Sequence, residues 1–214
     1  MNIYKSMKKK DVIKRLYKKN VTNFFFSIYG KVTNYKYDLK RVIIKNIDKI
    51  DNINVKKFNY KIFSIKDGRV FTNYVETLAV ICKNSLIKEV SFQQIKGKLH
   101  KSKNQVLETG TPKFLKKFSG RLLVLSQGAS GHFNYAHWLF DIIPKIKMFS
   151  EKYNIQDIDF FYFSKLTIFQ KETLRLLNIN LKKIIDSNKF RHIQASKIYT
   201  VTHPNYFTGT IFKA

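Results

Sequence analysis

Side chains that can carry chemistry are concentrated between residues 134 and 145. They are Asn134, Tyr135, His137, Trp138, Asp141 and Lys145. His137 and Asp141 are four residues apart, so on a helix they lie on the same side. A carboxylate at that spacing holds an imidazole in one tautomer and raises its basicity. The spacing therefore predicts a general base that takes a proton from a hydroxyl group.

Each of these residues also has a structural interpretation, which the sequence leaves open. A His–Asp pair at this spacing is common in helices without catalysis, and a lone Trp138 is more often core than ligand platform. Asn134 suits a helix N-cap, and Lys145 suits a solvated surface. Pro144 falls inside the helix and predicts a kink there.

The elements around this segment predict what positions it. Four apolar runs are expected to be buried strands, at 121–127, 158–164, 183–187 and 197–203. Helices are expected at 133–151 and from Thr167, where Gln170 completes a capping box. Alternating strands and helices are typical of a parallel Rossmann-type sheet. The glycine-containing segment 128–131 places the start of the first helix at the carboxyl edge of that sheet, where ligands bind.

The helix at 133–151 is expected to have two faces. The apolar face, which we expect in the core, consists of Tyr135, Leu139, Ile142, Ile146 and Phe149. The polar face carries the candidate site, with Asn134, His137, Trp138, Asp141, Lys145 and Met148. The other histidines, His100, His132, His192 and His203, are interpreted as surface or capping residues.

The preceding region, residues 31–118, is predicted to be rich in β-structure. A strand is expected at 41–47, a hairpin at 60–72 that turns at Asp67–Gly68, and a second hairpin at 75–93 that turns at 83–85. Together these give a small antiparallel sheet over 59–95. Residues 96–118 are rich in lysine and are expected to be a surface connection.

The first 30 residues are predicted to be a basic helix. Val12, Ile13, Leu16 and Tyr17 recur at helical spacing among lysines and one arginine. Two interpretations stay open: a helix lying on anionic lipid, or a solvated helix that packs on its own domain. No apolar run is long enough to span a membrane, and neither a signal peptide's apolar region nor its cleavage site is evident.

The net charge of +27 raises the question of nucleic acid. Only 6 of the 41 basic residues are arginines, the side chains that best recognise phosphates and base edges. The excess of lysine, asparagine and isoleucine favours AT-rich coding bias over a dedicated nucleic-acid surface. Cys82, the single cysteine, is expected to be a buried apolar residue and excludes a disulfide framework within the chain.

The segment NYAHWLFDIIPK, residues 134–145, resembles the signature of the family 61 glycosyltransferases. The matching positions are Asn134, Tyr135, His137, Trp138, Leu139, Asp141 and Pro144. The chain departs at Ala136, where the family favours an aromatic residue, and at Lys145, where it favours arginine. Lysine cannot make a bidentate contact to a phosphate or carboxylate. Segments 68–92 and 169–179 also resemble the family, which extends the resemblance over about residues 60 to 200.

The resemblance implies a GT-B-like α/β fold in which a basic helical N-terminus (1–30) and a β-rich region (31–118) precede an α/β region (119–214). It implies that the second, donor-binding half is missing or incomplete. His137 and Asp141 would be catalytic, and Asn134, Tyr135, Trp138 and Lys145 would bind substrate. The donor would be a nucleotide-sugar, with no metal or other cofactor.

The implied activity is glycosyl transfer to a cell-surface glycan or lipid-linked acceptor in polysaccharide or lipopolysaccharide biosynthesis. The expected location is the cytoplasm, peripheral at the inner face of the membrane, with no specific nucleic acid as partner. Two alternatives stay open. One is a non-catalytic basic protein that binds nucleic acid or anionic membrane, and the other is an inert fragment.

Overall fold

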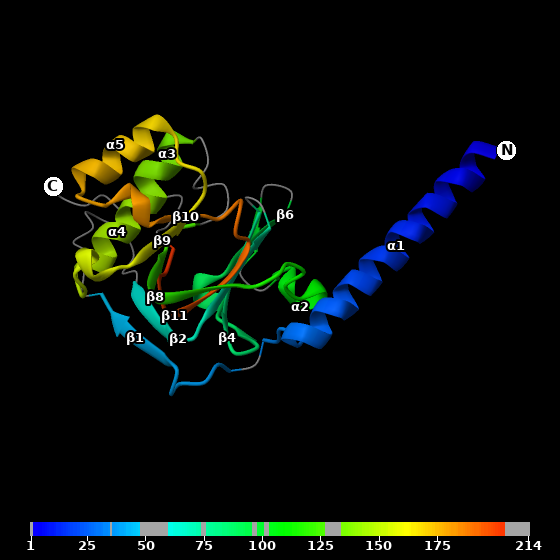
Figure 1. Ribbon diagram of the computed structural model, residues 1–214, viewed down its shortest axis with the longest axis horizontal. Coiled ribbons are helices and arrows are strands. Elements are labelled where there is room, and N and C mark those ends of the chain that lie inside the picture. The colour runs from blue at the N-terminus through cyan, green and yellow to red at the C-terminus, as the bar shows by residue number, and fades with distance from the viewer. Residues whose placement is uncertain are drawn as a thin grey trace.

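The computed structural model describes residues 2–34, 36–47, 60–73, 76–95, 98–100, 103–126 and 134–203. It shows a mixed α/β protein with an open sheet of parallel and antiparallel strands. Three helical segments gather on one side of the sheet, and a long N-terminal helix projects away from it (Figure 1). The predicted α/β class is confirmed at this level.

The bounds of the elements are as follows. The helices are α1 Asn2–Tyr29, α2 Val106–Thr109, α3 Tyr135–His137, α4 Ile143–Ser150 and α5 Ile168–Leu176, with a π-helical turn η2 Trp138–Ile142 and 3-10 turns η1 Lys88–Val90, η3 Ile155–Asp157 and η4 Leu181–Lys183. The strands are β1 Val42–Asn46, β2 Lys61–Lys66, β3 Arg69–Asn73, β4 Thr77–Cys82, β5 Ser85–Leu86, β6 Phe92–Ile95, β7 Lys98–His100, β8 Lys116–Val124, β9 Phe160–Phe163, β10 Ile184–Asp186 and β11 His192–Val201.

The predicted parallel sheet is present as strands β10, β9, β8 and β11, in that spatial order and all parallel. Counted along the chain, this is the order third, second, first, fourth, which matches one three-stranded Rossmann-type half followed by the first strand on its other side. The strands β9 and β10 are added in turn on one side of β8, whereas the next strand, β11, is added on its other side. Ligand crevices in open α/β sheets form at such a point, at the carboxyl ends of the strands.

Helices and a connecting segment cover opposite faces of these parallel strands. Phe161 and Phe163 of β9 face α4 and α5 and share a buried cluster with Phe149 and Leu174. Tyr162 points to the other face, because side chains alternate along a strand. There its hydroxyl donates a hydrogen bond of 2.6 Å to the carbonyl of Phe190, in the segment that links β10 to β11.

The hairpin predicted at Asp67–Gly68 is wrong. Strands β2 and β3 follow one another along the same edge of β11, and both pair with it in antiparallel fashion. Asp67 has a φ of 51° and donates its N–H to the carbonyl of Ser196, while Gly68 accepts from the N–H of Ala195. An Asp-Gly pair suits such a bulge as well as a turn, because both need a positive φ.

This bulge divides the sheet into two branches. Beyond β2 lies β1, and beyond β3 lie β4, β6 and β7. Because β11 pairs with β8 on its other edge, the antiparallel and parallel regions form one continuous sheet. The hairpin predicted around residues 83–85 is confirmed, since Ile81 pairs with Leu86 and Cys82 with Ser85. Cys82 is buried, as expected.

The segment 96–118 is more structured than the predicted surface connection. Its described residues contain β7, α2 and the start of β8. Asn104 is buried and ties two strands together, because its amide group donates to the carbonyls of Leu78 and Phe92. Its side-chain oxygen accepts from the N–H of Val106 at the start of α2. A buried amide that is fully paired in this way holds α2 against the sheet.

From residue 11 onward, where its side chains are described, the N-terminal helix α1 touches the body at its last turns. Phe25 is buried and lies edge-on to Phe114, and the hydroxyl of Tyr29 accepts from the N–H of Leu115 at 2.9 Å. Residues 11–20 are all exposed. The interpretation that this part of the helix packs on its own domain is therefore wrong. Within the described residues, no helix is long and apolar enough to span a membrane.

Candidate active site

The candidate site lies at the start of the helix that follows β8. Asn134 is the N-cap, as predicted, and its side-chain oxygen accepts the N–H of His137 at 3.2 Å. The glycine-containing segment 128–131 that we expect to precede it falls outside the described residues. Since β8 and β11 run in parallel with Val124 opposite Thr200, the ends of both strands meet at this edge of the sheet. Ser126 and His203, which follow these two strands, therefore belong to the same edge.

The helix widens directly before Pro144. Residues Trp138–Ile142 form a π-helical turn, and Ile143 donates its N–H to the carbonyl of Trp138, five residues back. Pro144 then stands in the first turn of α4, where its missing N–H and fixed φ are tolerated. A π-helical turn holds one more residue than an α-turn, and such turns are frequent at functional sites.

His137 and Asp141 form the closest contact in the candidate site. Nδ1 of His137 lies 2.7 Å from Oδ2 of Asp141. The Asp141 side chain is 1% exposed, whereas that of His137 is 34% exposed. An ionised carboxylate can only accept, so the proton of a neutral imidazole resides on Nδ1 and Nε2 becomes the basic nitrogen. The pair thus has the tautomer that a general base needs.

Lys145 lies one turn beyond Asp141 and is buried. Only 2% of the residue is exposed. Burial lowers the pKa of Lys145 from 10.5 to about 7, and the charge of Asp141 opposes that change. A buried lysine near its titration point beside a buried carboxylate is typical of functional sites, although structural networks produce it too. The expectation that Lys145 lines an open cleft does not agree with this burial.

Trp138 belongs to the core and not to an open surface. It is fully buried, and its ring lies edge-on to those of Phe163 and Phe169 at 5.4 and 6.5 Å. Tyr135, in contrast, is 57% exposed, and its ring lies 5.2 Å from that of Phe169. The expectation that Tyr135 and Leu139 face the core is wrong, because the π-helical turn shifts the phase of the helix. Ile142, Ile146 and Phe149 are buried as expected.

Sequence reasoning missed one contribution to this site. Phe169, at the start of α5, supports both Tyr135 and Trp138, and only the packing of two helices brings it there. Within the described part of the chain, no group of three His, Cys, Asp or Glu side chains is arranged to hold a metal ion.

Comparisons with known proteins leave the family open: no protein-family model, no curated protein and no solved structure matches the chain.

Proposed function

We propose that this chain carries the acceptor-activating site of a glycosyltransferase, with His137 as the general base. The observation that carries the proposal is the 2.7 Å contact between His137 and the buried Asp141. It lies on the helix that begins at the carboxyl edge of a Rossmann-type half sheet. The resemblance of residues 134–144 to the family 61 signature supports sugar transfer as the chemistry.

In the proposed reaction a hydroxyl oxygen of the acceptor attacks the anomeric carbon of a nucleotide-sugar. The new glycosidic bond forms as the bond from that carbon to the phosphate oxygen breaks, and the nucleotide leaves with the bonding electrons. Nε2 of His137 takes the hydroxyl proton. Asp141 stabilises the imidazolium that results, because its carboxylate already contacts Nδ1.

The remaining site residues take different parts in this proposal. Tyr135 offers an exposed ring face on which a sugar can stack. Asn134 caps the helix and so fixes the position of His137. Trp138 and Lys145 act from the interior: the indole supports the helix against β9, and the lysine acts on Asp141 through its charge.

The donor in this proposal is a nucleotide-sugar, and the acceptor is a glycan or a lipid-linked sugar. The main alternative, a basic protein without catalysis, predicts binding that depends on lysine charge and fades with salt. These two functions differ in their selectivity. An enzyme site discriminates between donors through buried contacts, whereas a lysine surface binds every polyanion in proportion to its charge.

Calorimetric titration with UDP-, GDP-, CMP- and dTDP-sugars at physiological salt tests the proposal. A working donor site on this chain would bind one donor saturably, with its own nucleotide competing, and would show that the donor-binding half expected to be missing or incomplete is functional. The variant His137→Gln should keep this affinity within about threefold, because the general base acts on the acceptor hydroxyl. Weak binding of all four donors that disappears with added salt would contradict the proposal and favour the alternative.

A further inference from the structure

The exposed part of α1 has two chemically different sides. At about 100° per residue, Val12, Ile13, Leu16, Tyr17, Phe24 and Ile28 fall within an arc of about 160°, which also holds three uncharged polar residues, Asn20, Asn23 and Ser27. These six side chains, which we call the apolar stripe, are between 48% and 72% exposed. Lys14, Arg15, Lys18 and Lys19 occupy the rest of the circumference, and Asp11 is the single acidic residue from position 11 to the end of the helix. An apolar face this exposed marks an interaction surface.

The apolar stripe continues onto the body of the protein. The ring of Phe24 lies 6.5 Å from that of Phe114, which is 74% exposed and precedes β8. Phe114 also contacts Phe25, the buried residue at the foot of α1. The helix and the body thus share one exposed aromatic contact.

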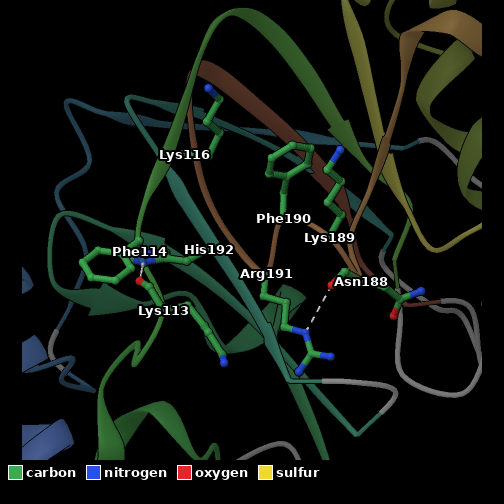
Figure 2. A pocket seen from close by; sticks show the side chains of 8 residues that line it. All are labelled: Lys113, Phe114, Lys116, Asn188, Lys189, Phe190, Arg191 and His192. Atoms are coloured by element: carbon green, nitrogen blue, oxygen red, sulfur yellow. Dashed lines mark hydrogen bonds between the residues drawn. The ribbon is translucent and has the colours of Figure 1, made fainter.

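A cationic cavity opens beside this contact. It has a volume of ≈430 Å³ and is lined by Lys113, Phe114, Lys116, Asn188, Lys189, Phe190, Arg191 and His192. None of these residues is acidic. Figure 2 shows the ring of Phe190 between the amino groups of Lys116 and Lys189 in the upper part of the view, while Lys113 and Arg191 extend toward the lower part. Such a lining suits a phosphate group.

We infer that the apolar stripe of α1, Phe114 and the cationic cavity together form a docking surface for an anionic phospholipid bilayer. The stripe enters the interface between headgroups and acyl chains, and the lysines beside it extend toward the headgroups. The cavity takes a lipid phosphate. This inference rests on the surface of α1 and not on the proposed glycosyl transfer.

A second copy of the chain is a poorer fit to the same stripe. A coiled coil needs apolar residues at alternating spacings of three and four along one seam. The seam through Ile13 and Leu16 continues with Asn20 and Asn23. The seam through Tyr17, Val21, Phe24 and Ile28 is apolar for only four positions, because Lys14 and Lys10 precede it. The net charge of +27 also opposes close association of two copies and favours an anionic partner.

Vesicle sedimentation of the full chain tests this surface. We expect binding to phosphatidylcholine vesicles that contain phosphatidylglycerol, and at least tenfold weaker binding to phosphatidylcholine alone. Leu16→Glu should weaken binding to the anionic vesicles at least tenfold. The matched control is Leu176→Glu on α5, which makes the same change at a residue 83% exposed and far from α1 in the chain; it should bind as the wild type does.

Leu16→Lys separates insertion from simple charge attraction. It adds a positive charge but removes an apolar side chain, so our inference predicts weaker binding than wild type. Tighter binding by Leu16→Lys would overturn the inference, because charge alone would then suffice. A wild-type dimer in sedimentation analysis that Leu16→Glu disperses, without vesicle binding, would also overturn it and assign the stripe to a contact between copies.

Lys116→Gln and Lys189→Gln test the cavity. Each should weaken binding to anionic vesicles by about fivefold, the usual contribution of one lysine near such a surface. Inorganic phosphate at the concentration of the lipid phosphate should leave the binding unchanged. Loss of vesicle binding in that phosphate would instead make the cavity a site for free phosphate and overturn its assignment to lipid.

Discussion

Replacing Lys145 by methionine tests whether a charged group is buried behind the candidate site. Lys145 is 2% exposed, and burial lowers its pKa from 10.5 to about 7. At about 1.4 kcal/mol per pKa unit, this lowering of the pKa corresponds to about 5 kcal/mol of destabilisation at a pH where Lys145 is protonated in the folded protein. Methionine has a similar length and needs no hydration, so Lys145→Met should be more stable near pH 7 by about 1–4 kcal/mol.

The sign of the pH dependence makes this prediction specific. Below about pH 7 both states carry the proton, so the full destabilisation is present. Between about pH 7 and 10.5 the unfolded state binds the proton and the folded state does not, so wild-type stability rises with pH relative to the variant. The difference between the two proteins should therefore shrink by about 1.4 kcal/mol for each pH unit in this range.

Urea unfolding of both proteins at several pH values from about 6.5 to about 9.5 measures this difference. Lys147→Met is the matched control, because Lys147 is on the same helix but is exposed and pairs with Glu151 at 3.1 Å. Its loss should change stability by less than about 1 kcal/mol. If the free energies of unfolding of wild type and Lys145→Met differ by the same amount at every pH in this range, the burial of a titrating lysine is refuted.

Three further substitutions test the framework of the sheet. Gly68→Ala would place a Cβ 2.8 Å from Ile65 Cγ2, so urea unfolding should show a loss of about 1–3 kcal/mol, and an unchanged midpoint would contradict the bulge. Burial lowers the pKa of His192 from 6.5 to about 4, so stability is lost as the pH falls through this range, by up to about 3 kcal/mol. Between about pH 7 and pH 5, the midpoint of thermal unfolding should fall less in His192→Phe than in wild type. An equal fall in both proteins would count against the buried imidazole. Asn104→Ala leaves the buried carbonyls of Leu78 and Phe92 without their donor, at a cost of about 1–3 kcal/mol in urea unfolding, and a loss below about 0.5 kcal/mol would refute these hydrogen bonds.

Local patterns in the sequence predicted the elements well, because local physics determines them. The apolar runs around Leu123 and Phe161 form buried strands, and Gln170 accepts the N–H of Thr167 in the predicted capping box. Asn134 caps its helix as expected. Each of these features depends on residues within a few positions of one another.

Features that depend on distant segments were not predictable in the same way. Asp67–Gly68 is compatible with a hairpin or a bulge, and the pairing of both flanking strands with β11 decides between them. His192 was expected at the surface or in a cap, yet it is fully buried between the rings of Tyr29 and Phe71. No pattern within a few residues of His192 indicates either neighbour.

The candidate site contains one contact that the sequence predicted and burial that it did not predict. The contact between His137 and Asp141 follows from their spacing, and the structure brings the two atoms to 2.7 Å. Trp138 opens the π-helical turn and is buried against Phe163 and Phe169. Lys145 comes after the turn, whose extra residue shifts every later position around the helix axis. Pro144 predicted a disturbance of the helix at this point but not its form.

The most direct test of the central claim is to look for sugar transfer itself. Wild type and His137→Gln would be incubated with the donor panel and with glycan and lipid-linked acceptors, and products followed by mass spectrometry and by release of the nucleotide. The proposal predicts an acceptor that gains one sugar as one nucleotide is released, and a rate lower by at least about 10² in His137→Gln. Transfer at the wild-type rate by His137→Gln, or no transfer by wild type from any donor, would contradict it.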